Sequence, residues 1–306
     1  MSRFLLLLCL IVLAGPALAD TLRHDGRDRD YLIERPPGLA LPAPTVFVLH
    51  GGGGTAERTR RTTAFHASGA RAGYVTVYPQ GIGNQWNDAR EAAAIRRKQG
   101  GEVIDDVGFL TALAQQLVQA GIADARRIYA TGASNGGMMT FRLACEAAGV
   151  FAAFAPVIAN LPEKAERTCR PARPVPLMLL NGTADELILW DGGAVAPMFP
   201  ADRGTTLSTD RTLAVFRALN GCAGPAMPGP ERDLGGGIRL TVTGSEGCRD
   251  GTNVILYRFD GMGHRWPETA NSRLPGRFGD LLGPAPANYP ASREIRAFFA
   301  RHPMPE

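Results

Sequence analysis

The chain has 306 residues, of which 45% are hydrophobic and 20% charged. This balance excludes a disordered polyelectrolyte and suits one globular α/β domain. The net charge is only +4, and the arginines are scattered apart from short groups at 58–61 and 96–98. Because such short groups usually form solvated faces, we expect no nucleic-acid partner.

The N-terminal residues have the pattern of an export signal. Arg3 gives a positive start, residues 4–14 form an apolar run, and Ala17-Leu18-Ala19 resembles a cleavage site ahead of Asp20. We therefore expect a cleaved signal peptide over residues 1–19 and a secreted or periplasmic protein. The apolar run is too short to cross a bilayer as a helix, so we expect no membrane span.

Strand-forming segments alternate with helical patterns along the rest of the chain. The strand-forming segments are Tyr31–Ile33, Thr45–Leu49, Tyr74–Tyr78, Arg127–Thr131, Phe154–Ile158, Pro176–Leu180 and Asn253–Phe259. Helical patterns cover Glu57–Arg71, Val107–Ala120 with Asp105 or Asp106 as its cap, Met138–Ala148, and Ser292–Arg301 with a polar N-cap. Polar segments at 81–101, 191–204 and 225–237 are expected to be loops. The alternation predicts one α/β domain over residues 20–306, with a mostly parallel central sheet and helices on both faces.

Four cysteines remain after the predicted signal peptide: Cys145, Cys169, Cys222 and Cys248. An even count in an exported chain favours disulfides over free thiols. Three pairings are possible. We favour the pairing of neighbours in the sequence, 145 with 169 and 222 with 248, because each pair brackets a single excursion of the chain.

The segment YATGASNGG at residues 129–137 has the pattern of a nucleophile elbow. It places Ser134 in a Gly-x-Ser-x-Gly motif between an apolar strand and a helical run. The serine of such a turn has a strained backbone, and side chains at Gly132 and Gly136 would collide with the strand or the helix. The motif predicts that Ser134 is a nucleophile rather than an ordinary turn residue.

A serine nucleophile needs an imidazole base and a carboxylate that orients the imidazole. Of the five histidines, only His264 follows an apolar strand in a glycine-rich loop. Asp185 follows the strand at 176–180, where the catalytic groups of parallel sheets collect. Asp191, farther along the loop, and Asp260, close to the strand that carries His264, are alternatives. We prefer Asp185 because it lies at a strand end and fits the chain order Ser, Asp, His of α/β hydrolases.

The run of glycines after His50 predicts an oxyanion hole. We expect the backbone N–H groups of Asn135 and of Gly51 or Gly52 to bind the oxyanion, with His50 packed beneath the loop. A phosphate-binding loop is the rival interpretation, but no Gly-Lys-Ser/Thr follows. The scattered histidines and the lack of HExxH predict neither a metal site nor a cofactor.

Six ordered motifs identify the chain as similar to one family. They are VLHGGGG at 48–54, VYPQG at 77–81, DDVGFL at 105–110, YATGASNGGMM at 129–139, NGTAD at 181–185 and GMGHRWP at 261–267. The set resembles the secreted esterases that include poly(3-hydroxybutyrate) depolymerases, in the α/β-hydrolase superfamily and akin to feruloyl and acetyl xylan esterases. This resemblance implies an α/β-hydrolase fold and cleavage of carboxylic esters by Ser134, Asp185 and His264.

The sequence leaves the substrate open. The oxyanion loop has a glycine where polymer-degrading members carry a cysteine, and we expect no polymer-binding module, so small or oligomeric esters are candidates. Trp86, Trp190 and Trp266 lie in loops near the expected site and are candidates to line it, but packing is the safer interpretation of each. A serine peptidase on the same fold and a non-catalytic secreted binding protein are the alternative functions.

Overall fold

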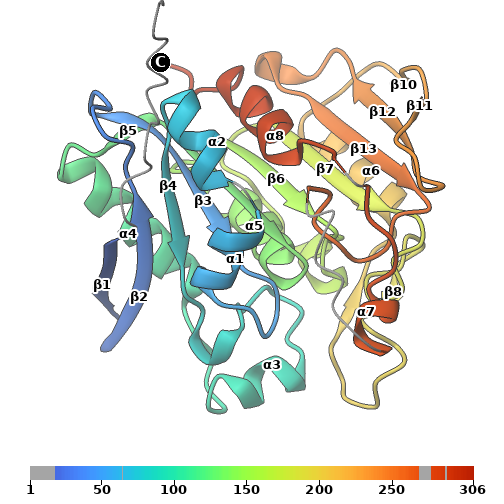
Figure 1. Ribbon diagram of the computed structural model, residues 1–306, viewed down its shortest axis with the longest axis horizontal. Coiled ribbons are helices and arrows are strands. Elements are labelled where there is room, and N and C mark those ends of the chain that lie inside the picture. The colour runs from blue at the N-terminus through green and yellow to red at the C-terminus, as the bar shows by residue number, and fades with distance from the viewer. Residues whose placement is uncertain (1–17, 64, 269–276, 287) are drawn as a thin grey trace, which may run out of the picture.

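The computed structural model describes residues 18–63, 65–268, 277–286 and 288–306. These residues form a central sheet between two layers of helices (Figure 1). The predicted signal peptide lies almost wholly outside them, and only its last two residues, Leu18 and Ala19, are described, at the start of strand β1 (Leu18–His24).

The centre of the sheet is parallel. Its parallel strands are, in spatial order, β4 (Val75–Pro79), β3 (Ala43–Leu49), β5 (Ala123–Ala133), β6 (Ala153–Val157), β7 (Leu177–Gly182) and β13 (Val254–Asp260). Antiparallel strands extend the two edges: β2 (Arg27–Glu34) and β1 beside β4, and β12 (Arg239–Ser245) with β10 (Ala226–Pro228) and β11 (Arg232–Asp233) beside β13. Every predicted strand segment coincides with a strand of this sheet, and the mostly parallel arrangement is confirmed.

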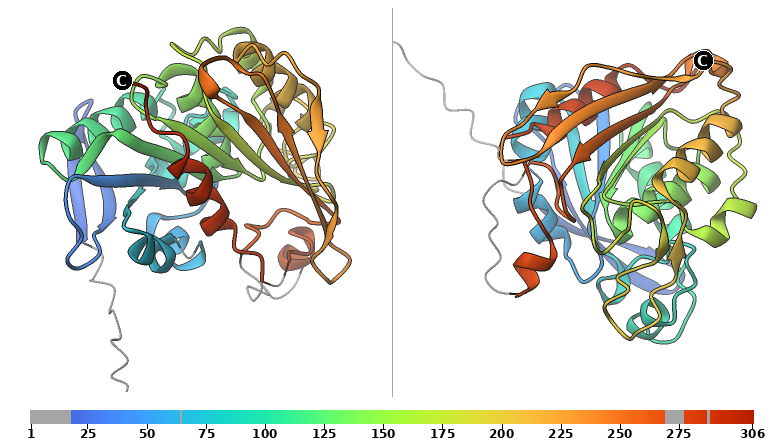
Figure 2. Two further views of the ribbon diagram at one scale, coloured as in Figure 1. Left: turned by 90° about the horizontal axis from the view of Figure 1, so that it is seen from above. Right: turned by 90° about the vertical axis from the view of Figure 1, so that its right-hand side faces the viewer.

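Helices cover both faces of the sheet. Helices α1 (Ala56–Thr62), α2 (Phe65–Ala72) and α8 (Ala291–Ala300) lie on one face, and α4 (Asp106–Gln119), α5 (Asn135–Glu146) and α6 (Thr209–Leu219) on the other (Figures 1 and 2). Strand β3 serves both layers, because Val46 and Val48 join the core under α8 while Phe47 and Leu49 join the core under α4 and α5. A parallel strand covered on both faces must be apolar throughout, which explains its continuous hydrophobic sequence.

The helix predicted over residues 57–71 is two helices, α1 and α2. Helix α1 ends at Thr62, and its cap Thr63, with φ −107° and ψ 0°, makes the last backbone bond to the Thr59 carbonyl. The hydroxyls of these threonines donate to the carbonyls of Arg58 and Thr59 one turn earlier. Such bonds, together with β-branching, make adjacent threonines poor helix formers.

Two predicted caps have different outcomes. Asp105 caps α4, since its carboxylate accepts a hydrogen bond of 2.9 Å from the Gly108 amide, which confirms one of the two candidates. Ser292 does not cap α8, which begins after Pro290. The Ser292 hydroxyl lies inside the helix and donates to the Thr63 carbonyl, so it joins α8 to the end of α1.

Several elements interrupt the expected loops. Helix α3 (Ala93–Lys98) lies in the polar segment 81–101, and strands β10 and β11 lie in the segment 225–237. Helix α6, which begins after a cap by Ser208, lies outside the expected loops and was not predicted. The remaining short elements are β8 (Gly193–Ala194), β9 (Thr205–Thr206), the 3-10 turns at Ile82–Asn84, Glu163–Arg167 and Arg249–Gly251, and α7 (Arg277–Leu281). No helix in the described ranges combines the length and apolarity needed to cross a membrane.

Candidate active site

The three proposed catalytic residues follow neighbouring parallel strands. Ser134 follows β5, Asp185 follows β7 by three residues, and His264 follows β13 by four. These strands lie in the order β5, β6, β7 and β13, so the loops after them leave the same edge of the sheet (Figure 1). Carboxyl ends of parallel strands are where the fold can gather side chains that are distant in sequence.

The turn at Ser134 has the strained geometry expected of a nucleophile elbow. Ser134 has φ 57° and ψ −119°, and its side chain makes no capping hydrogen bond to α5. A Cβ atom on Gly132 would lie 2.6 Å from the Gly136 carbonyl oxygen, and one on Gly136 would lie 2.5 Å from the His50 carbonyl oxygen. Real side chains do not fit at those distances, so both positions require glycine, as the sequence predicted.

Asp185 and His264 form a buried hydrogen-bonded pair. The distance from His264 Nδ1 to Asp185 Oδ2 is 2.7 Å, and the two residues are 8% and 4% exposed. The other oxygen of Asp185 accepts bonds of 2.8 Å from the amides of Leu187 and Ile188. The carboxylate is thereby fixed, and it favours the tautomer with a proton on Nδ1, which leaves His264 Nε2 able to accept a proton.

The two alternative aspartates occupy other environments. Asp260 pairs with Arg258 at 2.7 Å, and Asp191 is exposed. Within the described residues, Asp185 is the carboxylate that contacts His264.

The glycine-rich loop after β3 approaches the elbow closely. A Cβ atom on Gly51 would lie 3.6 Å from the Ser134 Cβ, and one on Gly52 would lie 3.5 Å from the Asn135 Cβ. The Gly53 amide donates to Asn84 and the Gly54 amide to Gly51, whereas no such bond engages the amides of Gly51 and Gly52 in the described part of the chain. The Asn135 amide begins α5 and has no partner one turn earlier in that helix. Among the described residues, the loop and the helix start therefore present N–H groups without a backbone partner beside Ser134.

His50 is a buried structural residue under this loop. Its Nε2 accepts a bond of 2.9 Å from the Gly81 amide, and its Nδ1 lies 2.8 Å from the Gly51 carbonyl oxygen. This pattern fits a neutral ring with its proton on Nδ1, and burial lowers the pKa of His50 to about 4. The expectation that His50 packs beneath the loop is confirmed.

The three tryptophans differ in their environment. The structure contradicts a substrate contact for Trp86, which is fully buried and donates from Nε1 to the His50 carbonyl. Trp266 is nearly buried and packs edge-on against Phe65, and Trp190 is half-buried with the Arg258 guanidinium 5.2 Å from its ring. Both remain only predictions as substrate contacts.

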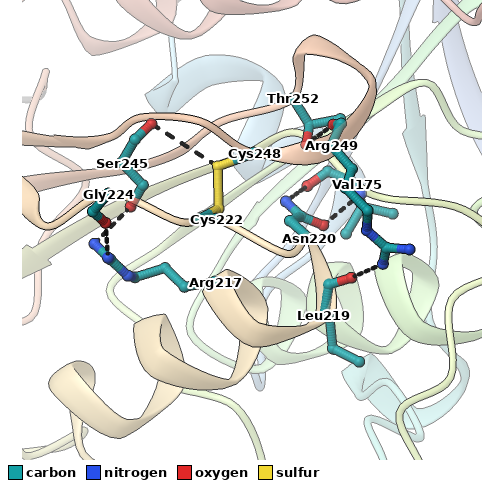
Figure 3. The surroundings of a disulfide bond; sticks show 10 residues. All are labelled: Val175, Arg217, Leu219, Asn220, Cys222, Gly224, Ser245, Cys248, Arg249 and Thr252. Carbon is teal, nitrogen blue, oxygen red and sulfur yellow. Dashed lines mark hydrogen bonds between the residues drawn. A yellow bond between two sulfur atoms is a disulfide. The ribbon is translucent and has the colours of Figure 1, made fainter.

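Two disulfides have the pairing that the sequence favoured. Cys145 is bonded to Cys169 and Cys222 to Cys248. The second bond joins the chain after α6 to the segment before β13 (Figure 3). Both bonds involve segments that lead into the amino ends of strands, at the opposite end of the sheet from Ser134.

Sequence reasoning missed several buried polar residues near the site. Asn181, in the NGTAD motif, donates from its amide to Asn160, Thr209 and the Ala159 carbonyl, and it accepts from the Ala159 amide. Asp88 accepts from the Asn135 side chain. A buried polar residue looks like an ordinary loop residue in a sequence, and only its partner, distant along the chain, reveals its role. No cluster of metal-binding side chains occurs among the described residues.

Comparison with known proteins agrees with this geometry. A Ser, Asp and His set on a mostly parallel sheet defines an α/β hydrolase. The profile of the prolyl oligopeptidase family matches residues 61–162. The chain is 33% identical over 255 residues to "Putative esterase NocK" of Nocardia uniformis subsp. tsuyamanensis, covering 79% of this chain and 72% of that protein. The chain therefore belongs to this esterase family of the α/β-hydrolase superfamily.

Two further relatives extend the comparison. Feruloyl esterase B of Piromyces equi is 30% identical over 162 residues. These residues cover 52% of this chain but only 29% of that longer protein. The solved structure of an acetyl xylan esterase from Aspergillus awamori superposes with a TM-score of 0.53 at 15% identity, over 82% of this chain and 94% of that one. At that identity the superposition supports the fold alone.

Proposed function

We propose that the protein is an exported serine esterase that hydrolyses carboxylic esters through an acyl-enzyme on Ser134. The observation that carries this proposal is the 2.7 Å contact between His264 and Asp185, on loops that leave the same sheet edge as the strained Ser134 turn. Membership of the esterase family supports the reaction class. The two disulfides fit an oxidising compartment.

In the proposed mechanism, His264 Nε2 takes the hydroxyl proton of Ser134 as Oγ attacks the ester carbonyl. The charge that forms on the carbonyl oxygen is bound by the N–H groups of Asn135 and of Gly51 or Gly52. His264 then gives its proton to the departing alcohol, and a water molecule, activated in the same way, releases the acid. Asp185 stabilises the positively charged imidazole throughout.

A test of the proposal compares wild type with Ser134→Ala on p-nitrophenyl acetate and butyrate. We expect the alanine variant to lose turnover by about 10⁴-fold or more, because the nucleophile is absent. Full turnover in that variant would remove Ser134 from the mechanism. Labelling of wild type by a fluorophosphonate, and its loss in Ser134→Ala, separates the enzyme from a non-catalytic binding protein.

The substrate class within the esters is the finer part of the proposal. The similarity to relatives named feruloyl esterase and acetylxylan esterase favours feruloyl or acetyl esters, and the motifs also fit 3-hydroxybutyrate oligomers. Relative kcat/KM on methyl ferulate, acetylated xylan and 3-hydroxybutyrate oligomers would rank the three. A ranking led by any of them assigns the acyl or alcohol group that the site accepts best.

A serine peptidase is the second candidate, and one observation favours it. The profile that matches residues 61–162 is named for prolyl oligopeptidases, although it covers about a third of the chain. The first chemical step would be the same, so an amide substrate decides between them. Cleavage of a dipeptide p-nitroanilide with a kcat/KM above that for p-nitrophenyl acetate would favour the peptidase.

A further inference from the structure

Asp88 is a buried carboxylate that the proposed mechanism does not use. It is 1% exposed, and its Oδ2 accepts a bond of 2.6 Å from the side-chain amide of Asn135, the residue after the proposed nucleophile. A buried carboxylate is costly unless it is paired and hydrogen-bonded, so the fold must compensate this charge. This bond links the buried carboxylate directly to the residue that follows Ser134.

Arg90 provides the compensating charge. Its guanidinium lies 2.7 Å from Asp88 Oδ2 and donates from another nitrogen to the Arg203 carbonyl at 2.9 Å. The neighbours Ala89 and Glu91 have φ values of 69° and 55°, a left-handed conformation that residues other than glycine rarely adopt. Strained backbone of this kind persists only where surrounding contacts enforce it, and it clusters at functional sites.

The side chain of Asn135 is held at all of its polar atoms. Its Oδ1 accepts from the Trp86 amide at 2.8 Å, and its Nδ2 donates to the Trp86 carbonyl at 2.9 Å as well as to Asp88. Asn135 therefore cannot rotate without breaking three bonds in a buried environment. Its own backbone N–H is the first proposed oxyanion donor.

The same segment also contacts the glycine loop that carries the second donor. The Trp86 indole donates to the His50 carbonyl at 2.9 Å, and the Gly53 amide donates to the Asn84 carbonyl at 2.7 Å. The Gln85 side-chain amide lies against Gly52, where a Cβ atom would be 3.1 Å from Gln85 Oε1. Segment 84–90 thus touches both halves of the proposed oxyanion hole.

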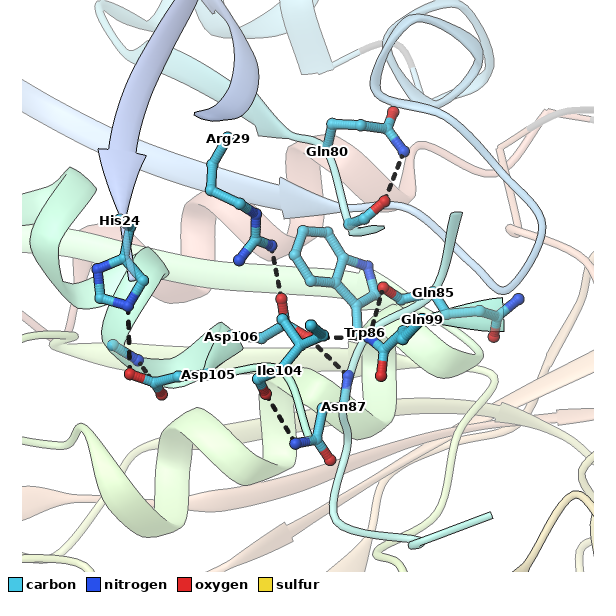
Figure 4. Close-up of polar contacts among 12 residues, drawn as sticks. His24, Arg29, Gln80, Gln85, Trp86, Asn87, Gln99, Ile104, Asp105 and Asp106 are labelled. Carbon is cyan, nitrogen blue, oxygen red and sulfur yellow. Dashed lines mark hydrogen bonds and ion pairs between the residues drawn. The ribbon is translucent and has the colours of Figure 1, made fainter. Parts of the chain in front are cut away.

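A second buried ion pair anchors this segment to the body of the protein. Asp106 accepts from the Asn87 amide at 2.7 Å and pairs with Arg29 at 2.6 Å (Figure 4). Burial raises the pKa of Asp106, and the Arg29 charge opposes that rise. The segment is therefore fixed at Asn87 to the start of α4 and at Asp88 to the start of α5.

We infer that segment 84–90 sets the distance between the two oxyanion donors, with Asp88 and the Asn135 side chain as positioning residues. The inference rests on the proposed function. The backbone N–H of Asn135 is rigidly placed because the Asn135 side chain is bound to the same segment that holds the His50–Gly54 loop. Since Arg90 neutralises Asp88, the carboxylate can hold Asn135 without repelling the nearby oxyanion. A misplacement of an ångström in such a site can reduce turnover about 100-fold.

The test uses two matched asparagines. Asn135 bonds the amide and carbonyl of Trp86, and Asn220 bonds the amide and carbonyl of Val175 at 2.8 Å each (Figure 3). Val175 lies before β7, at the opposite end of the parallel strands from Ser134. Asn135→Ala keeps the backbone N–H but loses the anchor, and Asn220→Ala loses the same pair of bonds away from the site. We expect the thermal midpoint to fall in both variants, and further in Asn135→Ala because it also loses the bond to Asp88. We expect kcat to fall about 100-fold in Asn135→Ala and to stay at the wild-type value in Asn220→Ala, with KM unchanged in both.

A transition-state analogue gives a second measurement. A trifluoromethyl ketone forms an adduct with a serine hydroxyl that carries an oxyanion, so its affinity reports the donors directly. In Asn135→Ala and in Asp88→Asn we expect its inhibition constant to rise by the same factor as kcat falls. Loss of activity that only follows the fraction of unfolded protein, or equal kcat in the two asparagine variants, would overturn the inference.

The outcomes also separate this inference from the proposed function. If Ser134→Ala keeps full activity, the esterase mechanism fails and the positioning role fails with it. If hydrolysis depends on Ser134 while Asn135→Ala retains wild-type kcat and inhibitor affinity, the mechanism stands and the positioning role alone is wrong.

Discussion

The two ends of the parallel strands are stabilised in different ways. At the amino ends, two disulfides and the two hydrogen bonds between the Asn220 side chain and the Val175 backbone hold the segments that enter β7 and β13. At the carboxyl ends, the structure uses buried side-chain hydrogen bonds, such as those of Asn181 and Asn135. Disulfides restrict the unfolded chain, whereas buried polar networks fix the orientation of individual groups. The difference indicates that stability and positioning are supplied largely at opposite ends.

Helix α6 connects the two ends. Thr209 in its first turn bonds to Asn160 at the carboxyl ends, and Asn220 and Cys222 after its last turn belong to the amino ends. If the amino ends of the strands mainly provide stability, changes there should lower the free energy of unfolding and leave turnover intact. Changes at the carboxyl ends should lower turnover beyond any loss of stability.

The largest effect is expected for Asp185→Asn. An amide would retain the acceptor for Leu187 and Ile188 but could present an N–H toward His264 Nδ1, which favours the wrong tautomer. We expect kcat to fall about 10⁴-fold with little change in the free energy of unfolding. Steady-state kinetics and urea denaturation measure the two quantities. A fall of less than tenfold would exclude Asp185 as the orienting carboxylate.

The next effect belongs to the amino ends. Replacing both Cys222 and Cys248 by serine opens a loop of 26 residues in sequence separation, and we expect a loss of about 3 kcal/mol in the free energy of unfolding. The kcat of the folded variant should equal that of wild type, because no contact of Ser134, Asp185 or His264 is lost. Urea denaturation and ester hydrolysis below the new midpoint test both statements. A large fall in kcat would break the proposed division between the ends.

Most of the fold could be predicted from local signals, and most of the polar network could not. The strands of the central sheet can be recognised in the sequence because burial on both faces requires continuous apolar residues, such as Val46 to Leu49. Helix α6 also carried a signal that we did not use: Ser208 caps it, and Phe216 is buried on its inner side. A cap followed by apolar residues at helical spacing would have found it.

The proposed catalytic residues could be chosen from local signals, unlike the polar residues that support them. Ser134, Asp185 and His264 follow strands in a fixed chain order, so a motif and a strand pattern were enough to propose them. Asp88 and Asn135 meet across 47 residues of sequence, and nothing local in either segment specifies the other. The sequence could not decide between substrate contact and packing for Trp86 for the same reason, because a loop tryptophan and a core tryptophan look alike until the chain around it is folded.

A smaller effect is expected on acidification, at both ends of the strands. Burial lowers the pKa of His50, at the carboxyl ends, and of His302, two residues before the Met304 amide that bonds to Arg126 near the start of β5, to about 4 in each case. The unfolded chain binds these protons near pH 6.5 and the folded protein only near pH 4. The stability that these neutral histidines contribute is therefore fully present above pH 6.5 and is lost as the pH falls from 6.5 to 4. Between pH 7 and 5, each histidine should lower the free energy of unfolding by about 2 kcal/mol.

The contribution of each end can be separated with one variant. In His302→Gln, the difference in unfolding free energy between pH 7 and 5 should shrink by the share of that histidine, while the share of His50 remains. Urea denaturation at the two pH values measures the difference. An unchanged difference would show that His302 is protonated in the folded protein at pH 5.

The smallest expected effect is at Ser208, where α6 starts at the carboxyl ends. The hydroxyl accepts a bond of 3.0 Å from the Arg211 amide, so Ser208→Ala should cost about 1 kcal/mol of unfolding free energy. Ser208→Asp keeps an acceptor at the cap and should retain wild-type stability. The next residue, Thr209, is held by its own bonds to Asn160 and Asn181, so kcat should not change in either variant. A fall in kcat for Ser208→Ala alone would mean that the first turn of α6 helps to position the catalytic loops, and the boundary between the two ends would then lie inside this helix.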